Sequence, residues 1–588
     1  MRKFAPLVFG AGLLLASCSG HNGAASLPST ATGGGVRPAS VNVAPAGWAS
    51  TATLALADAS HAVGTLDSAK TITISVGLQL RNVDQAKAAI AGGQTLDQAT
   101  FIANNSPTDA QVSQVRDYLT GQGFTNITVA PNNLLVDATG TVAQVQKAFN
   151  TSLGSFTQNG LPVYANTSPA YVPSSLGGIA VAVLGLNNLE AARTGPNKPA
   201  PADTPDKCKV GSNGLCARFY DVATFHIAYD VGNTPAGSRT AIGIFTVGKL
   251  DNAISEFRFN EQKQNLPTVP LSVVNVGTSS ADTSGDGEWI MDMTHSTGMA
   301  GNVKHLYLYN AATLSDSDII HEYNRWTSDN LAKVGSSSFG GCEVFPYLSG
   351  GMLMADMILT QAAAQGQTMF VSSGDNGGFC NNLVNTNGVP GGAPFVEWPA
   401  SSPYVVAVGG TDLFSNPDGT YLGEAAWEGG GGGISQFEYS PYWETPEQPV
   451  GNIPTGGRGV PDVAMDGSIE TAGIVYSHQV ATNGGTCENG CTAAGTSLSA
   501  PLAAGVYTRL QSAHYNKLGF GAVALYKIYA QNPNASQTSL GPAPTQLVGG
   551  FHDILGGSNG AYTSKPRYDY TTGLGSFDVA KTNALIGQ

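Results

Sequence analysis

The sequence predicts a chain of two folded domains, an α/β domain with a mainly parallel sheet at residues 208–588 and a smaller α+β domain before it at residues 50–188. Three observations predict this architecture. The chain has 588 residues, more than one hydrophobic core normally organises. A Pro-rich segment at residues 189–207 divides it. Beyond that segment, strand-like apolar runs alternate with helical patterns, a rhythm typical of parallel α/β sheets.

The elements of the first domain follow from its periodicity. Apolar and polar residues alternate through residues 70–78, as in a half-buried strand. Further along, we expect helices at 83–91, 109–121 and 142–149 and strands at 125–130 and 133–137.

The second domain shows apolar runs that predict buried strands, at residues 240–247, 305–309 and 368–372. Helical patterns lie between them, around Trp289 and at residues 352–365 and 498–513.

The N-terminus has the layout of a bacterial export signal over residues 1–18. Two basic residues precede an apolar run that is too short to span a bilayer. The run ends in a lipobox-like tetrapeptide at Cys18, which would receive a lipid and form the only attachment to a membrane; an ordinary cleaved signal is the alternative. Either predicts export from a bacterial cell, to the periplasm or the exterior. Residues 19–49, rich in Ser, Gly, Ala and Pro, predict a flexible tether.

The composition excludes some partners. The net charge is −14 and only 12% of residues are charged, so no basic stripe is available to replace phosphate counterions, and we expect no nucleic-acid partner. A low density of ionisable groups also limits self-repulsion when carboxylates are protonated, which is compatible with working in acid.

Seven cysteines become six when Cys18 is set aside. An exported protein can form disulfides, and six cysteines allow about fifteen pairings. Distance along the chain favours Cys208–Cys216, Cys487–Cys491 and Cys342–Cys380. A zinc site is the rival interpretation, but no CxxC pair or His cluster supports it.

The strongest chemical signal is Ser497, which a small-residue turn delivers to the start of an apolar helix. A nucleophile at that place benefits from the helix N-terminus and from backbone N–H groups that can face an oxyanion. The alternative is a simple helix cap.

Glu288 and Asp292 are four residues apart, so a helix would place both carboxylates on one face. Two carboxylates at that spacing repel each other unless they share a proton or bind a cation, and a shared proton raises one pKa. Such a pair suits a general base that works in acid. The alternative is a solvated acidic helix start; a calcium loop is a weaker one, since the EF-hand order is not met.

Asp375 follows an apolar strand and precedes a Gly-rich turn, the usual place for active residues in an open parallel sheet. Its alternative role is to stabilise the turn.

Together these residues resemble the sedolisin family, the kumamolisin-like serine-carboxyl peptidases, over residues 50–588. Glu288 and Asp292 match the family's Glu-x-x-x-Asp pair, Asp375 its Ser-Gly-Asp motif and Ser497 its Gly-Thr-Ser-x-x-x-Pro motif. The resemblance implies a subtilisin-like catalytic domain preceded by a ferredoxin-like activation propeptide.

The resemblance also implies roles and partners. Ser497 would be the nucleophile, Glu288 the general base, Asp292 the orienting acid and Asp375 the oxyanion donor. The implied enzyme is a secreted, acid-acting endopeptidase made as a self-processing zymogen, with the propeptide as intramolecular inhibitor and residues 189–207 as the processing segment. Its substrates would be proteins or peptides, and we expect a monomer.

The family carries one structural calcium ion, bound by two aspartates and main-chain carbonyls. The positions that correspond to these ligands are Asp553, Ile554, Lys565, Arg567 and Asp569. The chain has Lys565 and Arg567 where the family usually has glycines, which adds two positive charges and removes backbone freedom.

Two further residues depart from the family pattern, and the sequence also allows two rival interpretations of the function. Phe339 replaces a family tryptophan, and Ile244 stands where kumamolisin has an auxiliary glutamate. His295 begins a stretch that imitates the histidine block of a subtilisin-type triad, but no early aspartate accompanies it, so we expect a structural or exposed histidine. The other rival is a non-catalytic surface binding protein on the same scaffold.

Overall fold

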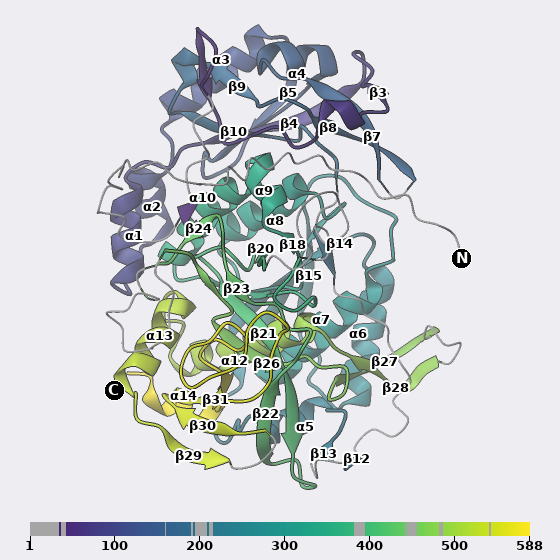
Figure 1. Cartoon of the computed structure of the whole chain (residues 1–588), viewed down its shortest axis with the longest axis vertical. Helices are drawn as coiled ribbons and strands as arrows, with labels where there is room; N and C mark the ends of the chain where they lie inside the picture. The colour runs from purple at the N-terminus through teal and green to yellow at the C-terminus, as the bar shows by residue number, and fades with distance from the viewer. Residues whose placement is uncertain are drawn as a thin grey trace, which may run out of the picture.

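The computed structural model describes residues 43–158, 160–189, 192–194, 209–210, 216–380, 394–441, 443, 456–480, 486–539 and 543–587, and the backbone of 35–36. The predicted export signal, Cys208 and most of the predicted processing segment lie outside these residues. Figure 1 shows the smaller N-terminal domain stacked on one side of the larger one. Across the described ranges, no helix is both long and apolar enough to cross a membrane.

The N-terminal domain is built on a four-stranded antiparallel sheet in the order β10-β4-β6-β5. Its strands are β4 (Thr71–Leu78), β5 (Thr125–Val129), β6 (Leu135–Thr141) and β10 (Ala180–Leu184). Helices α3 (Asp109–Gly121) and α4 (Val142–Ala148) cover its outer face, at the top of Figure 1. Strand order and connections are those of a ferredoxin-like fold, which confirms the predicted architecture.

Local sequence explains where these helices begin. Thr108 caps α3 and Thr141 caps α4, each in a capping box with the glutamine three residues later. Alternate residues of β4, such as Ile74 and Val76, then pack against the apolar face of α3 in a core of their own.

Two short helices, α1 (Val83–Ala91) and α2 (Gln98–Asn105), extend from this domain beside the larger one, at the left of Figure 1. The sequence patterns predict α1 but not α2. Within the predicted tether, Gly35–Val36 form strand β1, which pairs with β24 (Glu438–Tyr439), so these two residues are not a flexible linker.

The larger domain contains an eight-stranded sheet in the order β15-β16-β14-β17-β19-β21-β22, with β26 also paired to β21. All pairs are parallel except β21 with β22. The strands are β14 (Gly237–Val247), β15 (Leu271–Asn275), β16 (Val303–Ala311), β17 (Val334–Ser337), β19 (Thr368–Ser372), β21 (Val406–Ser415), β22 (Tyr421–Ala426) and β26 (Val463–Asp466). The predicted parallel α/β architecture is confirmed.

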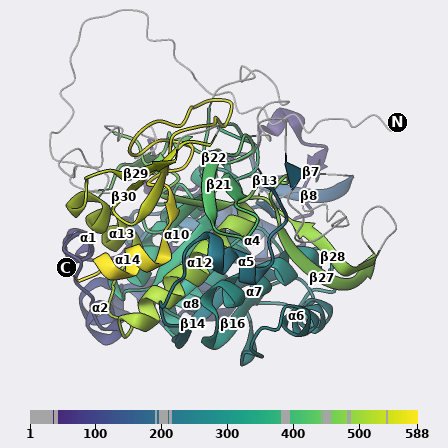
Figure 2. The ribbon, with the colours of Figure 1, turned by 90° about the horizontal axis from the view of Figure 1, so that it is seen from below.

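Helices cover this sheet from both sides. Figure 2 shows α7 (Asp286–Ala300) and α12 (Thr496–Ala513) near each other, and α12 packs against α7 and β14. On the side of the N-terminal domain lie α8 (Asp316–Asp329) and α10 (Gly351–Ala364) (Figure 1). The residues that follow β17 and β19 contact the first turns of α7 and α12, since Ser338 donates to Asp292 and the N–H of Gly374 donates to Thr496 Oγ1, and the site is built there.

The two domains are closely packed. Gly77 of β4 has no side chain, and the thioether of Met354 on α10 fills the place where a Cβ would stand. Nearby, Nε2 of His321 on α8 lies 2.9 Å from Oδ1 of Asp137 on β6. The buried amide of Asn132 donates to side chains of the larger domain as well.

Candidate active site

Ser497 is the second residue of α12 and is 2% exposed. Gly495 before the helix has φ +95°, and a Cβ there would stand 2.5 Å from Oδ2 of Asp375. Only glycine suits both the dihedral and the close approach. Oγ of Ser497 donates to the carbonyl oxygen of Ser338 at 3.2 Å.

Ser338 lies between Ser497 and one of the predicted acids, Asp292, and contacts both. It follows β17, and its Oγ donates to Oδ1 of Asp292 at 2.7 Å, with the carbonyl oxygen of Ser497 as a second acceptor at 3.3 Å. The sequence patterns did not single out Ser338. Its position at the carboxyl end of a parallel strand was the available signal.

Glu288 and Asp292 lie in the first two turns of α7 and are 2% and 0% exposed. The alternative of a solvated acidic helix start is therefore wrong. Burial raises the pKa of Asp292 well above its ordinary value, while the hydrogen bond from Ser338 acts in the opposite direction. The pair lies on one face of α7, where carboxyl groups share a proton more readily than they both ionise.

Asp375 lies in the turn after β19 and reaches the start of α12. Its Oδ1 accepts from the backbone N–H of Thr496 at 2.7 Å and from the Thr496 hydroxyl at 2.8 Å. Burial raises the pKa of Asp375, and these two hydrogen bonds oppose that effect. Asp375 is thus held by Thr496, the residue that directly precedes Ser497.

A cavity of about 250 Å³ opens beside these residues. It is lined from three directions, by the turn after β19, by the start of α12 and by strand β18 (Phe339–Cys342). The lining side chains and backbone belong to Arg193, Thr194, Ser338, Gly340, Gly341, Cys342, Ser372, Gly374, Asp375, Asn376, Cys380, Glu397, Thr496 and Ser497.

A strand from outside the larger domain's sheet lies along this cavity. β11 (Arg193–Thr194) pairs antiparallel with β18, with Arg193 opposite Gly340 and Thr194 opposite Phe339. β20 (Glu397–Trp398) pairs with the other edge of β18. The described part of the predicted processing segment therefore occupies the position of an extended peptide beside Ser497.

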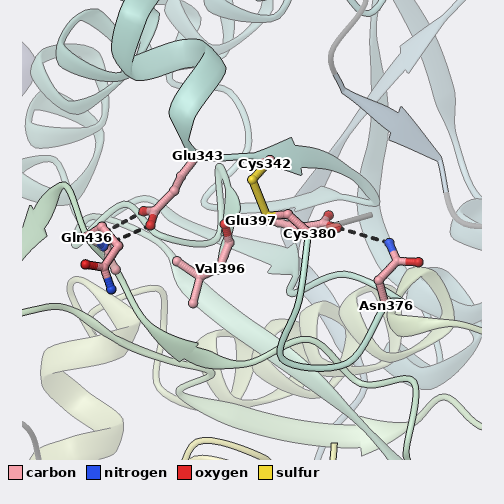
Figure 3. The surroundings of a disulfide bond; sticks show 8 residues. Cys342, Glu343, Asn376, Cys380, Val396, Glu397 and Gln436 are labelled. Carbon is pink, nitrogen blue, oxygen red and sulfur yellow. Dashed lines mark hydrogen bonds between the residues drawn. A yellow bond between two sulfur atoms is a disulfide. The ribbon is translucent and has the colours of Figure 1, made fainter. Parts of the chain in front are cut away.

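A disulfide closes the rim of the cavity. Cys342 at the end of β18 is bonded to Cys380, which follows the turn that carries Asp375, and Figure 3 shows Glu397 beside this bond. A second disulfide joins Cys487 and Cys491. Two of the three predicted pairings are thus confirmed, and the third involves Cys208, outside the described residues.

Glu397 is a second carboxyl group that the sequence patterns did not single out. Burial, and next the charge of Asp375, raise its pKa to about 7. In Figure 3 its carboxylate faces Asn376, whose Nδ2 donates to Oε1 at 3.4 Å. The available signal was its position directly before the Trp398-Pro399 pair.

His295 is structural rather than exposed. It is fully buried, its Nδ1 donates to the carbonyl oxygen of Met291 on its own helix, and its ring packs edge-on against Phe225. Burial lowers its pKa to about 4. Phe339 and Ile244, the two departures from the family pattern, are both fully buried apolar residues.

The predicted calcium ligands lie together near the C-terminus. Asp553 on β31 (Phe551–Ile554) and Asp569 are each 1% exposed, and burial together with the charge of Asp569 raises the pKa of Asp553 to about 7. The backbone N–H groups of Lys565 and Arg567 donate to these two carboxylates. Two adjacent buried carboxylates fit a hard cation, although no cluster of three acidic, His or Cys ligands occurs within the described ranges. Arg567 has φ +72°, a glycine-type conformation.

Comparison with known proteins matches both domains. Residues 58–189 match the family model "Pro-kumamolisin, activation domain", and residues 275–531 match that of the subtilase family. The chain is 34% identical to sedolisin of Pseudomonas sp. over 94% of both chains, and 33% identical to xanthomonalisin of Xanthomonas sp. over 89% of this chain and 66% of that one. A solved structure of Pseudomonas sedolisin, a serine-carboxyl proteinase, superposes with a TM-score of 0.54 at 32% identity, covering 63% of this chain and 98% of that one.

Proposed function

Because the chain belongs to the sedolisin family of serine-carboxyl peptidases and carries their activation domain, we propose that it is an exported, acid-acting endopeptidase made as a self-processing zymogen. Ser497 is the nucleophile, Glu288 the general base, Asp292 the orienting acid and Asp375 the oxyanion donor. The observation that supports these roles is the position of Ser338 between the two groups: its hydroxyl donates to the buried Asp292 and to the backbone carbonyl of Ser497, and its own carbonyl accepts from Ser497 Oγ.

Membership of this family makes the chain a serine-type peptidase, which argues against the rival interpretation of a non-catalytic binding protein. In the proposed reaction, Glu288 takes the proton of Ser497 Oγ as that oxygen attacks a peptide carbonyl, and the proton then passes to the leaving amine. Asp292 holds the proton that it shares with Glu288, in line with the effect of burial on its pKa. The rate falls in strong acid, where the pair carries no negative charge.

Asp375 stabilises the oxyanion together with the backbone N–H of Ser497. A carboxyl group can donate only when it is protonated, and the burial that raises the pKa of Asp375 supports this role. One such donor is worth about 3 kcal/mol of transition-state stabilisation. The rate therefore falls again toward neutral pH, and activity is expected in acid.

The N-terminal domain and the segment after it form the proposed inhibitor. Arg193 and Thr194 line the cavity beside Ser497 and pair with β18, so they cover the strand that a substrate would use. Cleavage within residues 189–207 would free that strand. The mature peptidase then corresponds to the domain that begins near residue 208.

Export rests on residues 1–18. If Cys18 carries a lipid, cleavage after the N-terminal domain leaves the lipid with that domain and releases the peptidase. Anchoring is then temporary.

One structural calcium ion is proposed at Asp553 and Asp569, with main-chain carbonyls of Ile554, Lys565 and Arg567 as the remaining protein ligands. When bound, the ion would neutralise two carboxylates that are buried side by side. The test is the thermal unfolding midpoint of the purified mature protein with calcium and with a chelator, and equal midpoints would argue against the site.

Self-cleavage tests the proposal. The purified precursor, incubated in acid, is expected to be cut within residues 189–207, and Ser497→Ala and Glu288→Gln are each expected to abolish the cut. His295→Gln separates this mechanism from a subtilisin-type triad: it should keep the activity here, whereas a triad histidine would be indispensable. Mass spectrometry of the products identifies the bond. Cleavage by the Glu288→Gln protein, or fastest cleavage at neutral pH, would contradict the proposed roles.

A further inference from the structure

The cavity beside Ser497 contains an acidic side chain that the proposed reaction does not use. Glu397 of β20 lies between β18 and the turn that carries Asp375. A Cβ at Gly340 would stand 3.2 Å from its Oε2, and a Cβ at Gly374 would stand 2.6 Å from its Cδ. Two glycines therefore leave the space that this carboxylate occupies.

The charges that face Glu397 are unevenly divided between the domains. Among the described lining residues of the larger domain, Asp375 and Glu397 are acidic and none is basic. Arg193 is the one basic residue in the described part of the lining, and it belongs to the segment that leaves on processing. The positive charge of Arg193 favours the ionised form of Glu397, against the effects of burial and of Asp375.

The strand pairing indicates which part of a substrate would reach this cavity. Arg193 lies opposite Gly340 and Thr194 opposite Phe339, so an extended chain in this register runs toward Ser338 and the nucleophile. In an extended strand, residues i and i+2 project to the same face. In this register, the substrate residue next to the scissile bond lies opposite Ser338. Its side chain therefore projects to the same face as that of the substrate residue opposite Gly340.

We propose that Glu397 is the specificity residue of this cavity and that it selects an arginine or lysine side chain of the substrate, at the residue preceding the scissile bond or two residues before it. The proposal rests on the proposed peptidase function. Arg193 supplies the positive charge in the precursor, and a substrate cation replaces it after processing.

A second property follows, because a proton and a cation compete for the same carboxylate. Among the residues that the structure describes, the charged groups that face Glu397 are Asp375, from the turn after β19, and Arg193, from β11, while β18 and the start of α12 bring no charged lining side chain. Burial and the charge of Asp375 raise the pKa of Glu397 to about 7, so in acid a substrate cation has to displace the proton of this carboxyl. The preference for a basic residue should therefore weaken steadily as the pH falls below 7.

The test compares the mature enzyme on peptides that differ at one residue, which is arginine or its neutral isostere citrulline, placed at either of the two positions. We expect kcat/KM to favour arginine by about tenfold at one position near pH 5.5 and by less near pH 3.5. Glu397→Gln should bring this ratio close to one, and the surface variant Glu470→Gln should keep it.

Equal cleavage of both peptides by the wild-type enzyme, at both positions and both pH values, would overturn the proposal even if no Glu397 variant folds. A ratio that persists in Glu397→Gln would overturn it as well, and Glu397→Asp, which keeps the charge, should retain part of the preference. Cleavage of the citrulline peptide that is lost in Ser497→Ala shows separately that the peptidase function holds. If no peptide is cleaved, the proposed function fails and this inference fails with it.

Discussion

Replacing Ser338 with alanine tests the connection between the acid pair and the nucleophile. The Ser338 hydroxyl donates to the fully buried carboxyl of Asp292 at 2.7 Å, and a hydrogen bond to an ionised group is worth about 1.5–3 kcal/mol. This bond lowers the pKa of Asp292 against the effect of burial, so its loss makes the pair harder to ionise. We therefore expect kcat/KM on the acidic limb of the pH–rate profile to fall about 10- to 100-fold and the limb to move to higher pH.

The measurement is kcat/KM against pH on one peptide for the wild type, Ser338→Ala and the matched control Ser336→Ala. Ser336 is equally buried, two residues earlier in β17, and its hydroxyl makes no hydrogen bond to any described residue. The control should keep the wild-type profile, and thermal unfolding of all three proteins shows that they fold. A profile of Ser338→Ala with its acidic limb unmoved would refute the reasoning, whatever the change in rate.

Three further predictions concern the frame of the site and its response to pH. Replacing Cys342 and Cys380 by serine removes the disulfide that joins residues 38 apart in the chain and should lower the free energy of unfolding by about 2–4 kcal/mol. An unchanged thermal unfolding midpoint under non-reducing conditions would contradict this. Gly495→Ala should slow self-cleavage at least about tenfold, because its Cβ would press on Asp375 at a positive φ, and a normal time course on a gel would disprove this. Burial raises the pKa of Asp316 to about 6, so this group stabilises the folded protein below about pH 4, and the stabilisation is lost as the pH rises through 6. In urea unfolding measured against pH, the wild-type free energy of unfolding should fall by about 3 kcal/mol more over this range than that of Asp316→Asn. Parallel plots of the free energy of unfolding against pH for the two proteins would contradict the prediction.

The sequence predicted those elements whose pattern decides their structure locally. The strand at 368–372 and the helix at 109–121 were found at the bounds the structure has, because one is a continuous apolar run and the other an amphipathic helix with a Thr-initiated cap. Helix α2 was missed because Phe101 is its one large buried apolar residue, and that residue belongs to the hydrophobic cluster that spans both domains. Tertiary contacts of this kind leave little trace in local periodicity.

The same distinction applies to the candidate site. Glu288, Asp292 and Ser497 stand in motifs whose spacing carries chemistry, and the structure buries them as the hypothesis of a shared proton requires. Ser338 and Glu397 stand in no such motif. Their relation to the nucleophile arises only when β17 and β20, far apart along the chain, are brought to the two sides of one cavity.

The pairing of β11 with β18 also governs how this protein can become active. Strand β11 is part of the same chain as the cavity beside Ser497 that it covers. It therefore competes with substrates at an effective concentration on the order of millimolar, whatever the amount of protein present. Dilution of the protein would not free this cavity, and dilute foreign peptides would not displace the strand. If the proposed self-cleavage occurs within one molecule, activation is first-order, and its half-time is independent of protein concentration until cut molecules begin to process their neighbours.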